Sequence, residues 1–206
     1  MLKRIGAEEL GEFKAVASGT LSSGKPVVVN SDGTVSVVST TTLTEAKGSN
    51  VEFESGAARN QAVVYDSNSD RVVIFYKDEN NSNYGTAIVG TVSGDSISFG
   101  TPAVFESANS DNMAAVFDSS NNKVVVGYRD VGNSNAGTAV VGTVSDTSIS
   151  FVTPVVFESG NTNNSMGMSF DTSANKVVIA FRDNGDSNNG KAIVGTVSGT
   201  SISFGS

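Results

Sequence analysis

The feature that most constrains the fold of this chain is a threefold internal repeat. One shared motif is the tripeptide Phe-Glu-Ser, which recurs every 52 residues and begins at Phe53, Phe105 and Phe157. A second motif, Gly-x-Ala-apolar-Val-Gly-Thr-Val-Ser, recurs at intervals of 52 and 53 residues and begins at Gly85, Gly137 and Gly190. Self-similarity at a fixed period of about 20–50 residues is typical of repeat architectures. The spacing places the extra residue of the third repeat in a loop at 161–165.

Each repeat divides into four predicted strands joined by polar turns. The repeats span residues 51–102, 103–154 and 155–206. In the first repeat the apolar clusters predict strands at 62–65, 71–76, 86–93 and 96–99. The second strand, Arg-Val-Val-Ile-Phe-Tyr, is apolar without clean alternation, which is typical of a strand buried on both faces. The same pattern recurs at 123–128 and 176–181.

Four antiparallel strands repeated along a chain predict an all-β fold, a β-propeller-like array of three four-stranded blades. Repetition follows from burial, because each blade has two apolar faces and each face needs a neighbour. A β-solenoid and an array of separate hairpin modules are the alternatives. Closed propellers have about four to eight blades. We therefore expect a homo-oligomer assembled blade to blade, six blades if two chains combine, or an excerpt of a longer array.

The first 50 residues do not share the repeat. Within them, 26–29 and 34–38 are predicted as two strands joined by the turn Asn-Ser-Asp-Gly at 30–33. Residues 39–50 are rich in Thr, Ser and Gly, as linkers are. The sequence thus predicts a boundary near Asn50, with an N-terminal anchoring and assembly region at 1–50 and the repeat domain at 51–206.

Composition excludes several classes of function. The net charge of −8 is spread thinly, so a nucleic-acid backbone would be repelled. The chain has no Cys, His or Trp, which removes thiolate chemistry, catalytic triads that use histidine and most zinc sites. No apolar run approaches the roughly 18 residues of a membrane span. We expect neither an enzyme nor a metal, cofactor, nucleic acid or membrane ligand.

Polar loops follow the buried strand of each repeat and are the candidate binding sites. Each loop begins with a cation and a carboxylate, and the first carries an aromatic residue, Tyr84, able to stack on a sugar ring. The pairs either pin the loops or form a polar binding rim. The spacing Asp78-x-Asn80-x-Ser82 resembles the start of a calcium loop but lacks the later Gly and Glu. The candidate ligand-binding residues are Lys77, Asp78, Asn80, Tyr84, Arg129, Asp130, Asn133, Asn135, Arg182 and Asp183.

Other repeated residues are predicted to be structural. A carboxylate at the first turn of each repeat is suited to accept backbone hydrogen bonds, at Asp66, Asp118 and Asp171. A glycine in the middle of the third strand permits close approach of a neighbour, at Gly90, Gly142 and Gly195. Two methionines of the third repeat, Met166 and Met168, are predicted to fill irregular core space.

With the repeats aligned, a resemblance becomes visible. The stretch VVIAFRDNGDSNNGKAIVGTVSGTSISFG at 177–205 resembles the iterated repeats of fibre and appendage proteins of tailed, particularly marine, bacteriophages, and 17–38 is similar to β segments near their N-termini. The chain departs from long fibres in having three repeats. The resemblance implies a virion structural protein, as fibre, appendage or capsid decoration, that attaches to other virion proteins through 1–50. The alternative is a lectin-like module that binds host-surface glycans.

Overall fold

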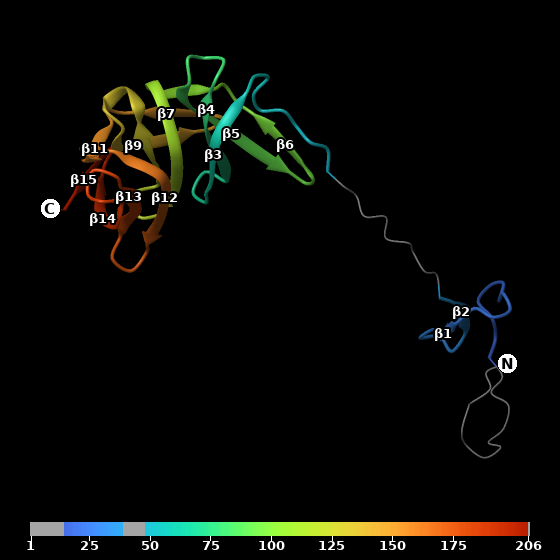
Figure 1. The fold of residues 1–206 in the computed structure, drawn as a ribbon. Coiled ribbons are helices and arrows are strands. Elements are labelled where there is room, and N and C mark those ends of the chain that lie inside the picture. Colours follow the sequence, from blue (N-terminus) through green and yellow to red (C-terminus); the bar gives the residue numbers. More distant parts are fainter. Residues whose placement is uncertain (1–14, 39–47, 206) are drawn as a thin grey trace. The chain divides into compact units, whose positions relative to one another are not determined.

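The structure, a computed structural model, describes residues 15–38 and 48–205 (Figure 1). The chain divides into two compact units, Met1–Ala46 and Lys47–Ser206, which are considered separately. Within the described residues the regular elements are β-strands and one short 3-10 turn, η1 (Val131–Asn133). The described strands all pair antiparallel, and an isolated parallel bridge joins Ala17 to Val35 of the N-terminal unit. The predicted all-β, antiparallel class is therefore confirmed.

The described part of the first unit is a β-hairpin. Strands β1 (Val27–Val29) and β2 (Val35–Val37) form the predicted hairpin, with Val29 opposite Val35. The turn between them is held by Asp32, whose carboxylate accepts a hydrogen bond from the backbone N–H of Thr34 at 2.9 Å. Other parts of the predicted anchoring region and linker, residues 1–14 and 39–47, lie outside the described residues.

The second unit contains three antiparallel meanders, one for each repeat. The first meander comprises β3 (Ala58–Asp66), β4 (Arg71–Asp78), β5 (Tyr84–Ser93) and β6 (Ser96–Phe99). The second comprises β7 (Ala103–Asp118), β8 (Lys123–Asp130), β9 (Ala136–Ser145) and β10 (Ser148–Phe151). The third comprises β12 (Thr162–Asp171), β13 (Lys176–Asp183), β14 (Asn189–Ser198) and β15 (Ser201–Phe204). The predicted strands are present, most of them longer than expected.

The first two meanders are joined by one long strand, which the sequence did not indicate. The first half of β7 pairs with β5 and its second half pairs with β8, so both meanders belong to a nine-stranded sheet. At the equivalent place in the third repeat the chain makes two strands. Strand β11 (Val155–Glu158) pairs back onto β9, and β12 then begins a separate four-stranded sheet.

The prediction that the extra residue of the third repeat lies in a loop is wrong. It lies inside β12, where the pairing with β13 shifts register between Thr162 and Met166. The equivalent shift in β7 lies between Asp111 and Ala114. The bulge in β12 therefore accommodates the additional residue, and the strand pairs on either side of it match those of β7.

Successive meanders pack face to face and bury two apolar clusters. Alternate side chains of β8 enter different clusters, because neighbouring residues of a strand point to opposite faces. Val124 and Val126 pack with Phe75 and other residues of the first meander, whereas Val125 packs with Ile179 and other residues of the third. The prediction of a strand buried on both faces is thus confirmed for β8.

The repeated structural residues take the predicted roles. Each turn aspartate accepts hydrogen bonds from the backbone N–H groups two and three residues later, as Asp118 does from Ser120 and Asn121 at 2.9 and 3.1 Å. The strand glycines leave room for an isoleucine of the following strand. A methyl group at Gly142 would come within 2.9 Å of Ile149. The sulfurs of Met166 and Met168 lie over Gly127 and fill the core there.

Candidate functional site

The predicted site aspartates hold their own loops together. Asp78, Asp130 and Asp183 stand at the ends of β4, β8 and β13 and are buried. Asp78 accepts hydrogen bonds from the backbone N–H groups of Asn80 and Asn81, at 3.1 and 3.0 Å. Asp130 and Asp183 bind loop N–H groups in the same way. These carboxylates thus serve the backbone, in the pattern of the turn aspartates.

The Asn and Ser residues of the loops also have a backbone role. Asn83 and Asn135 adopt left-handed conformations, with φ of 63° and 64°, which asparagine tolerates better than most residues. Their carbonyls accept hydrogen bonds from the first strand of the following repeat, Asn135 from the N–H of Thr162 at 3.0 Å. Tyr84 is not at a loop tip, because it is the first residue of β5 and pairs with Asp78.

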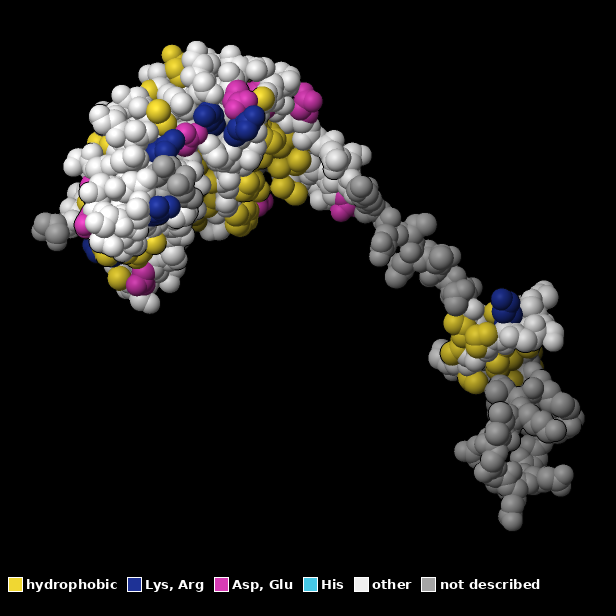
Figure 2. Space-filling model, viewed as in Figure 1, with side chains coloured by type: hydrophobic (Ala, Val, Ile, Leu, Met, Phe, Trp, Pro, Cys, Tyr) yellow, Lys and Arg dark blue, Asp and Glu magenta, His cyan; other side chains and the backbone are white. Residues whose placement is uncertain are grey.

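The structure brings two of the predicted cations together on one carboxylate. Asp111, on β7, accepts hydrogen bonds from Lys77 Nζ at 2.9 Å and Arg129 Nη2 at 2.6 Å. Asn60 contributes a third, at 2.9 Å. Burial alone would raise the pKa of Asp111, but the hydrogen bonds and charges of Lys77 and Arg129 outweigh it and hold the pKa below its ordinary value. Figure 2 shows Lys, Arg, Asp and Glu side chains in a row across this unit.

The third repeat carries a lysine on its third strand. Lys191 takes the place of the threonines Thr86 and Thr138. Its ammonium lies 2.6 Å from Asp183 Oδ2 and 3.2 Å from Asp186 Oδ2. The hydrogen bonds to these two carboxylates raise the pKa of Lys191, and the bond from Lys191 lowers the pKa of Asp183. The remaining candidate, Arg182, lies on β13 and pairs in register with Gly190.

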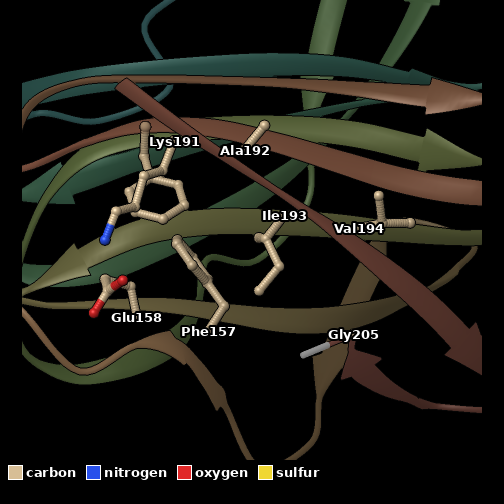
Figure 3. Close-up of a pocket in the computed structure, with 8 residues that line it drawn as sticks. Phe157, Glu158, Lys191, Ala192, Ile193, Val194 and Gly205 are labelled. Carbon is tan, nitrogen blue, oxygen red and sulfur yellow. The ribbon is translucent and has the colours of Figure 1, made fainter. Parts of the chain in front are cut away.

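An open strand edge distinguishes the third meander from the other two. The outer edge of β5 is covered by β6 and the first half of β7, and that of β9 by β10 and β11. On β14, β15 covers residues 195–198, and no described strand pairs with the first half beyond its contact with β13. A groove of about 430 Å³ lies there, lined among others by Phe157, Phe181, Lys191, Ala192 and Val194 (Figure 3).

The open edge lacks a phenyl ring that the other two edges have. In the first two meanders a glycine lies in the covered part of the edge strand, and the Phe of the next repeat lies on it. A methyl group at Gly85 would come within 2.5 Å of the Phe105 ring, and one at Gly137 within 2.5 Å of the Phe157 ring. At Gly190 nothing lies within 4 Å. The open space over Gly190, next to the groove, therefore corresponds to a phenylalanine position in the other two repeats.

Sequence reasoning selected the loops and did not select this edge as a site. The signal was present in the third repeat, which replaces a repeated threonine by Lys191. In the part of the chain that the structure describes, no group of three or more acidic, His or Cys side chains is arranged to hold a metal ion. The same residues include no helix long and apolar enough to span a membrane. No protein-family model matches the chain, and no curated protein matches it.

Proposed function

We propose that this protein is a non-enzymatic structural component of a bacteriophage particle, a fibre, appendage or capsid decoration that assembles from copies of itself. Residues 1–50 attach it to other virion proteins, and the meanders continue their stacking across copies in a propeller-like array. The sequence resemblance is the support for the virion and for the role of 1–50. One structural observation supports the self-assembly, namely the outward face of the first meander.

That face is exposed although it has the side chains of an interface. Val63, Tyr65 and Val92 are 62%, 54% and 57% exposed, and the strand register places them on one face of the sheet. Figure 2 shows hydrophobic side chains gathered over this meander. The residues 52 positions later pack against the cluster between the first two meanders, at Ala115, Phe117 and Val144. Exposed apolar side chains gathered on one face are typical of a contact surface.

The arrangement of the first strands supports a propeller-like stack. Strand β7 contacts both β3 and β12, so the first strands of the three meanders are neighbours. Radial arrays place the first strands of successive sheets around a common axis. Additional meanders from a second copy would extend this arrangement at the exposed face of the first meander.

The mass of the full chain in solution tests the self-assembly. Sedimentation equilibrium is expected to show an oligomer, and Val63→Asp is expected to yield a folded monomer, because a charge would be desolvated in the contact. Val156→Glu is the matched control, since Val156 is also exposed and the first repeat has Glu52 at the equivalent position. A monomer at every concentration, or equal effects of the two variants, would refute self-assembly through this face.

Particle incorporation tests the virion role. Deletion of 1–50 is expected to leave the repeats folded while the protein disappears from purified particles. Unchanged incorporation would refute attachment through this region.

The lectin-like alternative stays a prediction from the sequence. Its loop aspartates are engaged with backbone N–H groups, and Lys77 and Arg129 with Asp111.

A further inference from the structure

We infer that residues 51–55 of one copy add as a strand to the open edge of β14 in a second copy. This inference rests on the proposed self-assembly and identifies the two surfaces that meet. Addition of a strand to an exposed edge supplies main-chain hydrogen bonds, and pockets for alternate side chains supply specificity. The acceptor is the groove beside Gly190, and the donor is the first Phe-Glu-Ser motif of the chain.

The donor segment has the sequence of a covering strand but forms no strand in the structure. Its Phe53 ring already packs on its own meander, with centroids 5.2 Å from Tyr76 and 6.0 Å from Phe99. Phe157 contacts the equivalent rings of the third meander, Phe181 and Phe204, at 5.2 and 5.5 Å. Phe157 also lies on Gly137 of the preceding meander. Among the described residues, no glycine of a preceding meander lies against Phe53, and no phenyl ring lies against Gly190.

The hydrogen bond that holds this segment on its meander also occurs in the second repeat. Glu54 accepts a hydrogen bond from the hydroxyl of Tyr76 at 3.2 Å, as Glu106 does from Tyr128 at 2.9 Å. These contacts hold residues 51–55 on the exposed face of the first meander. The first half of β7 is held in the same way on the second meander, and the first meander lies on its other side. A second copy would provide the sheet on the other side of residues 51–55.

The repeat also fixes the register of the inferred pair. Within the chain, Thr86 pairs with Val104 and Thr138 pairs with Val156. The equivalent residues at the inferred contact are Lys191 of one copy and Glu52 of the other, which carry opposite charges. Because Lys191 already binds Asp183 and Asp186, we expect this pair to set the register more than the affinity.

The contact is head to tail, since different surfaces of the two copies meet. Heterologous contacts of this kind close into rings or continue as open fibres, depending on the rotation between copies. The outward face of the third meander, which includes the exposed Val194, would then cover the apolar face of the first meander of the next copy.

Cysteine cross-linking of the native oligomer tests the register. The chain has no cysteine, so every disulfide of the double variant Glu52→Cys, Lys191→Cys involves positions 52 and 191 alone, and the two single variants identify any 52–52 or 191–191 pairs. Mild oxidation is expected to give covalent dimers or longer ladders on a non-reducing gel. The control pair Glu52→Cys, Val194→Cys lies three residues out of register and is expected to cross-link poorly. A disulfide within one chain, or equal yields from the two pairs, would overturn the inference.

A glycine variant tests whether the Phe53 ring occupies the open space over Gly190. Gly190→Ala is expected to leave the fold unchanged, because nothing lies within 4 Å of the added methyl group. It is expected to weaken self-association by about tenfold or more, since the methyl would meet the Phe53 ring. Gly167→Ala is the control, also with open space around it, where the other repeats have Ala62 and Ala114. Equal association constants for the two variants would overturn the inference.

The outcomes separate this inference from the proposed function. If the full chain is monomeric at all concentrations, the self-assembly and the strand addition both fail. If an oligomer forms that tolerates Gly190→Ala and gives no cross-link between positions 52 and 191, self-assembly stands and strand addition fails. Exposed apolar faces of two first meanders would then meet directly.

Discussion

The ring of Phe105 lies on the backbone of Gly85 so closely that a methyl group there would come within 2.5 Å of it. The contact joins two meanders, because Gly85 lies on β5 of the first and Phe105 lies on the strand that leads into the second. The same ring packs edge-on against Tyr128, with centroids 5.2 Å apart. One side chain thus connects the backbone of one sheet to the aromatic core of the next.

Gly85→Ala should therefore destabilise the fold. We expect a loss of about 2 kcal/mol, because the buried ring and its neighbours must move. Gly190→Ala should change the stability of the monomer by less than about 0.5 kcal/mol, since the added methyl meets open space. Urea denaturation at dilute, monomeric concentration measures both. Similar losses for the two variants would show that the ring contact is not the cause.

Asp111→Ala should also destabilise the fold. It removes the acceptor shared by Lys77 and Arg129, whose side chains are 13% and 17% exposed. We expect a loss of about 2 kcal/mol, because both cations stay partly desolvated when the carboxylate that they share is removed. Comparison with Asp146→Ala supplies a control, since the Asp146 side chain is 82% exposed in its 3.4 Å ion pair with Arg71. That pair should contribute less than about 1 kcal/mol.

The contribution of Asp111 should depend on pH. Its folded pKa lies below the ordinary 3.8, so its stabilisation is complete above that value and is lost as pH falls through the lower folded pKa. The stability difference between the wild type and Asp111→Asn should be largest near neutral pH and shrink below about pH 4. Urea titrations across that range measure it. A difference that stays constant down to about pH 2 would contradict the ionic origin.

The turn aspartates should differ in importance. Asp118 is 1% exposed and accepts hydrogen bonds from two backbone N–H groups and from the side chains of Ser120 and Asn121. Asp171 is exposed and accepts two backbone bonds. We expect Asp118→Ala to cost about 2 kcal/mol and Asp171→Ala about 1 kcal/mol. Thermal unfolding followed by circular dichroism gives the order, and a larger loss at Asp171 would contradict it.

The repeat made the strands predictable but not the connections between meanders. Strand clusters such as 71–76 stand out because a sheet buried on both faces needs continuous apolar residues. Residues 107–112 fall outside the apolar clusters that predict strands, because most of them are polar, yet they lie within β7. Their strand conformation depends on tertiary contacts, with the left-handed Asn112 absorbing a register shift and Asp111 binding two cations from different meanders. Local pattern carries no information about such partners.

The role of the carboxylates in the candidate loops could not be predicted from the sequence for a similar reason. A carboxylate after a strand is compatible with a binding rim and with a turn, and the distinction depends on where the neighbouring N–H groups point. The spacing did contain a signal, since Asp78-x-Asn80 repeats the local order of Asp66-x-Asn68 at a known turn. The open edge of β14 was harder to find, because it is visible only when the three sheets are compared in space.

The long strand β7 has a mechanical consequence. Tension applied along the chain would load it in shear against two partners at once, β5 and β8, so the first two meanders should resist and yield together. In the third repeat that path is interrupted at 159–161, between β11 and β12. Under a pulling force the last meander is therefore expected to separate before the other two.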